Sequence, residues 1–439
     1  MTDRTSNARL RKNFISLFTL QGANYLLPLA TVPYLIRVLG PANFGKIAFA
    51  QALIQYFSTF VDYGFGLSAT QRASVVRDNK QQLSRLFFAV FYARIILLII
   101  GFAVLEELIL PLNRFSGDTS LYELAFLLPC GQAIIPMWFL QGIQKTQSVA
   151  IFSVAAKVIT TISVFLFVRN SEDYRIAIAI ISASTLIASV PSLISVYRTH
   201  GIRFVAPNVV DIGETFVDGW HAFVSMFGLS FYAFNSSFIL GLFAAPLVVG
   251  YYSAAEKLMK AMQGILLPVS QTVYPHIAHL LLQSQTIALR FVRRLLVVQS
   301  TMMLAFSLCT IIFARNIVHL LFGAASDPSI SILRWLALVP FVVSISNVLG
   351  MQVMMNFGMK RHFSRVMIVS SFVYLAICIP SARNFGACGA AFTLVLTECF
   401  SAAGMAVILY KKGYLCSILL GSEKCDEVND AFQHPNTSV

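Results

Sequence analysis

The chain has 439 residues, of which 57% are hydrophobic and only 12% are charged, and its mean hydropathy is +0.75. Soluble domains carry about 25% charged residues, so this composition, with 37 Phe, excludes an ordinary soluble protein and favours a polytopic membrane protein. The formal net charge of +13 then indicates basic cytoplasmic loops and a basic cavity rather than nucleic-acid binding.

Twelve stretches are apolar enough for spanning helices, each of which needs about 20 residues. The N-terminal segment MTDRTSNARLRKNF is basic and leads into the first stretch without a signal-peptide cleavage site, so we expect that helix to be retained. The predicted fold class is therefore an all-α polytopic membrane protein. In chain order the predicted spans lie near 14–37, 44–67, 86–108, 121–141, 147–168, 175–196, 219–243, 247–270, 292–313, 330–355, 363–382 and 387–410.

The distribution of Lys and Arg supports an even number of spans. If the N-terminus is cytoplasmic, twenty of the 32 basic residues fall inside, eight fall outside and four lie within spans. This is the asymmetry that the positive-inside rule predicts. We therefore expect both termini on the cytoplasmic side. The longest connections run near 68–85, 197–218 and 271–291, so no loop is long enough for a globular domain.

Two hairpins far apart in the chain share a pattern. RVLGPANFGKIAFAQAL and LGLFAAPLVVGYYSAAEKL each place a Pro at the end of one span and a Gly four residues later, at Pro41 and Gly45 and at Pro246 and Gly250. Ordinary hairpin chemistry explains each copy alone. The offset of 205 residues favours a six-plus-six duplication with binding between the halves. We expect an N-terminal lobe, 1–200, a C-terminal lobe, 201–412, and a polar cytoplasmic tail, 413–439.

Charged residues inside the predicted spans mark candidate functional positions, because each costs about 2.5–3.5 kcal/mol to insert. Glu256 and Lys260 lie four residues apart in the order that favours an ion pair, whereas Lys257 points to another face. Arg94, Lys157 and Glu398 are also embedded, and Asp62 and Arg37 lie near span ends. Each of these residues also has an explanation without a functional role. Arg37 and Asp62 could equally well extend to the membrane interface, and Arg94 could equally well form a structural ion pair with a neighbouring helix. Either explanation applies to Lys157.

The embedded set holds four cations, Arg94, Lys157, Lys257 and Lys260, against two carboxylates. A cavity with this bias suits an anionic ligand, and Lys binds phosphate as a compact point charge. Asn24 and Gln55 are among the uncharged polar residues that add hydrogen-bonding capacity. Glu256, Glu398 and Asp62 are alternatives for charge pairing or for carrying a coupling ion.

The sequence lacks the common catalytic and metal-binding motifs. It contains no Walker A motif and no H-E-x-x-H, and its seven Cys include no C-x-x-C pair. We interpret the Cys residues as small hydrophobic side chains. The sequence thus predicts no cofactor, no metal site and no enzyme activity.

Four segments resemble one family over nearly the whole chain. They are QGANYLLPLATVPYLIRVLGPANFGKIAFAQALIQYFSTFVDYGFGLSATQRAS (21–74), GYYSAAEKLMKAMQGILLPVSQTVYPHIA (250–278), SNVLGMQVMMNFGMKRHFS (346–364) and GACGAAFTLVLTE (386–398). They are similar to bacterial polysaccharide flippases of the Wzx type, in the multidrug/oligosaccharidyl-lipid/polysaccharide (MOP) exporter superfamily. The resemblance implies two six-helix lobes around a central cavity in the bacterial cytoplasmic membrane.

The resemblance also implies the substrate, an undecaprenyl-diphosphate-linked oligosaccharide that moves from the inner to the outer leaflet under an ion gradient. Its O-antigen or exopolysaccharide product would make a polymerase and a chain-length regulator candidate partners, beside membrane lipids and a proton or sodium ion. We hypothesise that Lys257 and Lys260 contact the diphosphate or acidic sugars, that Glu256 positions Lys260, and that Arg37 is an exit contact. Pro41, Gly45, Pro246 and Gly250 are expected to act in gating.

Two other classes of protein stay open at this point. An exporter of small cations or drugs in the same superfamily should have an acidic cavity, and this one is predicted to be basic. A membrane polysaccharide polymerase should have a large outside loop with catalytic residues, and the outside connections here are short.

Overall fold

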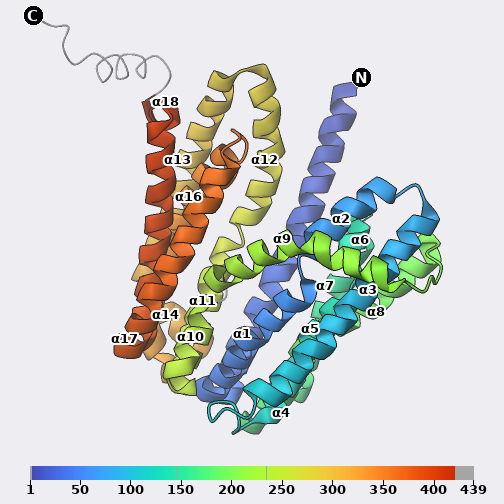
Figure 1. Ribbon diagram of the computed structural model, residues 1–439. Coiled ribbons are helices and arrows are strands. Elements are labelled where there is room, and N and C mark those ends of the chain that lie inside the picture. The colour runs from blue at the N-terminus through green and yellow to red at the C-terminus, as the bar shows by residue number, and fades with distance from the viewer. Residues whose placement is uncertain (1, 146, 234, 421–439) are drawn as a thin grey trace, which may run out of the picture. The chain divides into compact units, whose positions relative to one another are not determined.

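The computed structural model describes residues 2–145, 147–233 and 235–420, and within these ranges every regular element is a helix (Figure 1). The contacts divide the chain into two compact units, residues 22–253 and residues 254–439 with 1–21. The predicted all-helical class is therefore confirmed for the described residues. The lobe boundary at residue 200 stays a prediction.

The first unit contains most of α1 and all elements through the start of α11. Within it α8 packs along α7 and α5. The bounds are α1 (Thr2–Asp62), α2 (Phe65–Val76), α3 (Lys80–Val104), η1 (Leu105–Ile109), α4 (Thr119–Ala125), α5 (Leu127–Ile134), α6 (Met137–Gly142), α7 (Gln147–Phe167), η2 (Ser171–Asp173), α8 (Tyr174–His200), α9 (Val209–Ala233), α10 (Asn235–Phe243) and α11 (Pro246–Gln263).

The second unit contains the rest of α11 and the later helices, with α16 packed between α13 and α17 (Figure 1). Of the predicted polar tail, 413–439, the structure describes residues 413–420, which include α18, and the rest lies outside the described residues. The bounds are α12 (Leu266–Gln283), α13 (Gln285–Ile312), α14 (Ala314–Phe322), η3 (Ala324–Ser326), α15 (Pro328–Leu336), α16 (Val339–Asn347), η4 (Val348–Met354), α17 (Lys360–Lys411) and α18 (Tyr414–Leu420).

Eight helical stretches of the described chain are long and apolar enough to cross a membrane. Their apolar side chains also point outward, where a soluble protein would place polar ones. In α7, for example, Ile159, Ile162 and Phe167 are 49%, 53% and 62% exposed, which is the arrangement expected of a helix that faces lipid. The protein is therefore a multi-pass membrane protein. The eight stretches are 80–109, 119–142, 149–167, 171–199, 246–283, 285–312, 328–354 and 360–411.

Glycine interrupts the two longest helices where the sequence predicts a change of span. In α1, Gly40 has φ 76° and ψ 160°, between the first and second predicted spans. In α17, Gly386 has φ 58° and ψ −137°, between the eleventh and twelfth. A residue with a Cβ is strained at such positive φ values. The predicted total of twelve spans remains a prediction, since eight stretches meet the length and apolarity requirement.

Candidate functional site

The two hairpins that share the Pro-x-x-x-Gly pattern meet each other within the first unit. A Cβ added to Gly45 would lie 1.8 Å from the carbonyl oxygen of Pro246, and one added to Gly250 would lie 1.8 Å from the carbonyl oxygen of Pro41. The contact is therefore reciprocal, with each glycine placed against the other hairpin's proline. Only glycine lets the backbones of α1 and α11 approach this closely.

A further set of contacts within the first unit joins the second hairpin to α1 and to the loop after η1. A Cβ on Gly241 would lie 2.1 Å from the ring of Phe49, so α10 also packs through a glycine. The Arg114 guanidinium donates to the carbonyl oxygens of Gly241 and Ala244, with 2.9 Å from Nε to the former. Gly241 lies in the last turn of α10 and Ala244 directly after it, where carbonyl oxygens lack intrahelical donors. Arg114 thus caps the C-terminal end of α10 and links it to the loop after η1.

Arg94 and Asp62, which the sequence presents as separate candidates, form an ion pair. Arg94 is 4% exposed, and its Nη2 lies 2.5 Å from Asp62 Oδ1. Its Nη1 donates to the carbonyl oxygens of Gln132 and Ile135, at 3.2 and 3.1 Å. These carbonyls lie where α5 ends before Pro136, so the predicted fourth span is broken into short helices. The break leaves the two carbonyl oxygens without intrahelical donors, and Arg94 supplies the missing hydrogen bonds.

The charged residues of α11 adopt the arrangement that their spacing predicts. Lys260 Nζ lies 2.8 Å from Glu256 Oε1. Lys257 is partly buried, and within the described residues of its unit no carboxylate oxygen lies within 4.0 Å of its ammonium group. Lys257 therefore carries an embedded positive charge that no direct ion pair compensates in that unit, and such a charge favours an anionic partner.

The remaining predicted positions are spread over both units. Arg37 is exposed on α1, whereas Gln55 on α1, Lys157 on α7 and Glu398 on α17 are partly buried. The side chain of Asn24 lies outside the described residues. The structure thus brings together Arg94 with Asp62, Glu256 with Lys260, and the four hairpin residues.

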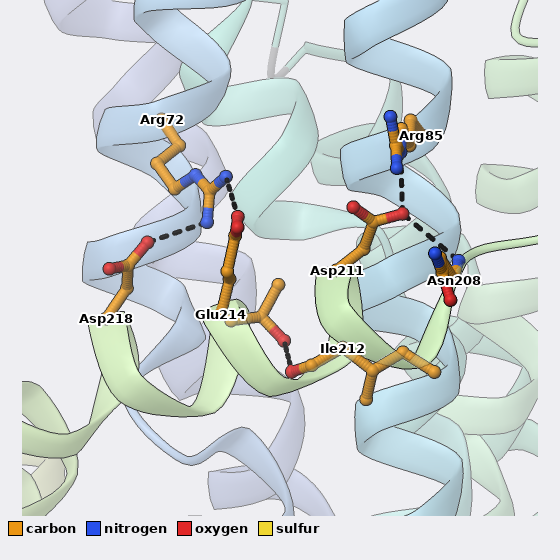
Figure 2. A network of polar contacts seen from close by, with 8 residues as sticks. Arg72, Arg85, Asn208, Asp211, Ile212, Glu214 and Asp218 are labelled. Atoms are coloured by element: carbon orange, nitrogen blue, oxygen red, sulfur yellow. Dashed lines mark hydrogen bonds and ion pairs between the residues drawn. The ribbon is translucent and has the colours of Figure 1, made fainter.

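A network that the sequence analysis did not predict attaches α9 to α2 and α3 (Figure 2). Arg72 lies 2.6 Å from Asp218 and 3.5 Å from Glu214, and Arg85 lies 2.6 Å from Asp211. Asp211, Glu214 and Asp218 share one face of α9 because they are three and four residues apart. That acidic stripe, opposite the basic connection at 68–85, is the sequence signal that could have revealed the network.

The α9 network, defined by these five residues, borders a cavity of about 510 Å³. The hydrogen bond that Asp211 accepts from Arg85 holds the pKa of Asp211 below its ordinary value. Aromatic packing continues the contact along α9, since the rings of Tyr63 and Phe223 stack with centroids 4.6 Å apart. The helix that follows the predicted N-terminal lobe is thereby fixed to that lobe's α2 and α3.

Comparison with known proteins places this architecture in a family. The family model described as polysaccharide biosynthesis protein matches residues 10–281. The chain belongs to this polysaccharide biosynthesis protein family. A relative from Escherichia coli strain K12, named "Putative O-antigen transporter", is 33% identical over 90% of this chain and 95% of its own length. One of the same name from Shigella dysenteriae is 25% identical over 89% and 97%.

Solved structures share the fold of this family member. The lipid II flippase MurJ in an inward closed conformation superimposes with a TM-score of 0.65 at 14% identity, covering 94% of this chain and 91% of MurJ. An inward-facing multidrug resistance MATE family transporter of the MOP superfamily gives 0.64 at 14% identity, with 95% and 96% covered. These two structures show the fold. The family match and the two relatives named for O-antigen transport confirm the resemblance found in the sequence and identify the chain as a membrane transporter rather than an enzyme.

Proposed function

We propose that the protein is a flippase that moves an undecaprenyl-diphosphate-linked oligosaccharide repeat unit from the cytoplasmic to the periplasmic leaflet. The observation that carries this proposal is the 33% identity, over 90% of the chain, to a relative named for O-antigen transport. The product would be O-antigen or another surface polysaccharide. The protein would lie in the bacterial cytoplasmic membrane with twelve spans and both termini in the cytoplasm.

The embedded charges support an anionic substrate. Lys257 has no carboxylate within 4.0 Å in the described part of its unit, and Lys260 is held by Glu256 while 47% of its side chain stays exposed. Both ammonium groups are suited to a diphosphate or an acidic sugar. Arg94 is already bound to Asp62 and two carbonyl groups, so we assign it a positioning role.

Alternating access would follow from the two hairpins that cross at Gly45 and Gly250, with binding between the lobes near the membrane midplane. Transport would be driven by a proton or sodium gradient. The candidates for carrying the coupling ion are Asp62, which pairs with Arg94, Glu256, which pairs with Lys260, and Glu398, which is partly buried on α17. Transport is to be compared in Asp62→Asn, Glu256→Gln and Glu398→Gln. The variant that loses the dependence of transport on the ion gradient identifies the coupling residue.

The function is tested by deleting the gene and measuring lipid-linked repeat units in each leaflet. We expect complete repeat units to accumulate on the cytoplasmic side, with no polymer on the surface. Unpolymerised repeat units on the periplasmic side, with a normal leaflet distribution, would instead indicate a defect in polymerisation and would refute the proposal.

Lys257→Ala in the complemented strain tests the substrate contact. A hydrogen bond to a charged group contributes about 1.5–3 kcal/mol, so we expect transport to fall at least about tenfold while the protein level stays normal. Lys257→Arg should retain part of the activity. Lys360→Ala, which removes an exposed lysine at the start of α17, is the matched control. Normal surface polysaccharide in Lys257→Ala would exclude this contact.

A further inference from the structure

A second cavity in the first unit has the lining of a small polar-ligand site. It has a volume of about 280 Å³ and is enclosed by α1, the loop after η1, α4, α8 and the α10–α11 hairpin. We call it the Lys46 cavity. In the proposed orientation it lies at the periplasmic end. Its polar and aromatic lining residues are Lys46, Phe49, Arg114, Phe115, Asp118 and Tyr122, with Tyr174 beside Lys46.

The aromatic wall of the Lys46 cavity is preformed by packing. The rings of Phe49 and Phe115 stack with centroids 5.6 Å apart, and Tyr122 meets Phe115 edge-on at 5.5 Å. All three residues are at least nine-tenths buried, so their rings are held by packing. The negative face of an aromatic ring attracts the weakly positive C–H groups of a pyranose, in the way that it attracts other ring edges.

Two of the three charged groups in the lining already have polar partners. Arg114 donates to the carbonyl oxygens at the end of α10. Asp118 accepts hydrogen bonds from the Tyr174 hydroxyl at 2.6 Å and from Arg175 Nε at 3.1 Å. These contacts fix the side chains of Arg114 and Asp118 in the walls of the cavity.

Lys46 differs from Arg114 in that no hydrogen bond to a described residue of the first unit holds it, and from Asp118 in its charge. Its ammonium nitrogen lies 4.6 Å from the centre of the Tyr174 ring. Among the described residues of the first unit, no carboxylate oxygen lies within 4.0 Å of it. Since an ammonium group carries three donors, Lys46 offers the cavity a positive charge and hydrogen bonds that no side-chain carboxylate takes up there.

We propose that the Lys46 cavity binds one sugar ring that carries an anionic group, with the ring against Phe115 and the anion at Lys46. Drug-sized ligands occupy pockets of about 300–1,000 Å³, so a cavity of about 280 Å³ accepts one sugar rather than a whole repeat unit. The inference rests on the proposed function for its orientation and for the origin of the sugar. The anionic group is either the carboxylate of an acidic sugar in the repeat unit or the phosphate at its reducing end.

The test measures sugar binding to the purified full-length protein, in a detergent without a sugar headgroup, by saturation-transfer difference NMR. The probes are methyl glucuronide, glucose 1-phosphate and methyl glucoside. We expect a saturable component for at least one anionic sugar that is at least fivefold weaker for the neutral glucoside. That component should fall at least tenfold in Lys46→Gln and persist in Lys46→Arg.

Two further variants separate binding from folding. Phe115→Leu should weaken the same component through the lost ring face. Arg169→Gln is the matched control, because Arg169 is an exposed cation that donates to the Leu166 carbonyl in the α7–η2 connection and does not line the cavity. Each variant must elute as a monodisperse protein with a wild-type melting temperature. If Lys46→Gln does not meet that criterion, the comparison of Phe115→Leu with Arg169→Gln decides.

The outcomes distinguish the two ligand sources and the two proposals. A response only to glucuronide assigns the acidic sugar, and one only to glucose 1-phosphate assigns the reducing end. Equal binding in wild type and Lys46→Gln, or no saturable binding of either anionic sugar, overturns the inference. Because the measurement involves no transport, sugar binding with normal leaflet distribution in the deletion strain would overturn the flippase proposal alone.

Discussion

The close crossing of α1 and α11 gives the sharpest prediction, because its geometry leaves no room for a single carbon atom. In Gly45→Ala, the new Cβ would begin 1.8 Å from the Pro246 carbonyl oxygen and 2.7 Å from the Gly250 nitrogen. Ordinary contact begins at 3.4 Å, so the two backbones must separate by about 1.6 Å. Both obstructing atoms belong to the main chain, so no side-chain rotation can relieve the overlap.

The expected cost follows from two opposing effects. Overpacking costs about 1–3 kcal/mol and more where the surroundings are rigid, which places this substitution at about 3 kcal/mol. Alanine recovers about 1 kcal/mol through its better helix propensity. The net loss of about 2 kcal/mol corresponds to a melting temperature about 4–8 °C lower for a unit of roughly 230 residues. Gly250→Ala should lose a similar amount, because its Cβ meets the Pro41 carbonyl at the same 1.8 Å.

The assay is thermal unfolding of the purified protein in detergent, followed by size-exclusion chromatography, with surface polysaccharide measured in parallel. The double variant should lose less than the sum of the single losses, since one separation of the helices accommodates both carbons. Gly213→Ala is the matched control, because a Cβ there has nothing within 4 Å and should be neutral or stabilising. Wild-type melting and export in Gly45→Ala would refute the reciprocal crossing.

Two further predictions concern the ion pairs. Arg94→Met should destabilise the protein by about 2–4 kcal/mol, because it removes a buried cation from Asp62 and from two carbonyl groups, while Asp62 keeps some hydration. Adding Asp62→Asn should recover part of that loss, as measured by thermal unfolding. Additive losses in the double variant would contradict the pairing. The stabilising contribution of Asp211 should be present at neutral pH and disappear as the pH falls below about 4 through its lowered pKa, because protonation removes the ion pair with Arg85. Asp211→Asn should therefore melt below wild type at pH 7 and approach it progressively as the pH falls below about 4. A constant difference would exclude this linkage.

The helical fold was predictable because each membrane-spanning segment can be recognised from its own local sequence. Long apolar runs, short connections and two glycines between adjacent spans define most of the helices before any tertiary contact is considered. The break before Pro136 was not predicted, since the apolar run continues across it and the carbonyls that it frees are satisfied by Arg94, about 40 residues away in the sequence. Hydropathy alone carries no information about such a distant donor.

The candidate site was predictable only where its contacts are local. The Glu256–Lys260 pair follows from helical spacing. The pairing of Asp62 with Arg94, and of Arg72 and Arg85 with the acidic face of α9, depends on which helices are neighbours. A single sequence lists these charges without assigning partners. In the sequence, Lys46 is one of the eight basic residues predicted to lie outside. Its role in a binding site could not be predicted, because it depends on a cavity assembled from five separate segments.

The repeated Pro-x-x-x-Gly pattern shows how one local signal can carry tertiary information. Considered singly, each copy is explained by a helix that starts after a tight turn. Considered together, the copies contain complementary halves of one contact, since the carbonyl of Pro41 needs Gly250 and the carbonyl of Pro246 needs Gly45. The predicted duplication would thus preserve a self-complementary crossing together with the hairpin chemistry, because each copy supplies both the obstructing carbonyl and the glycine that makes room for it. Substitution of either glycine alone should therefore be enough to disrupt the contact that both hairpins share.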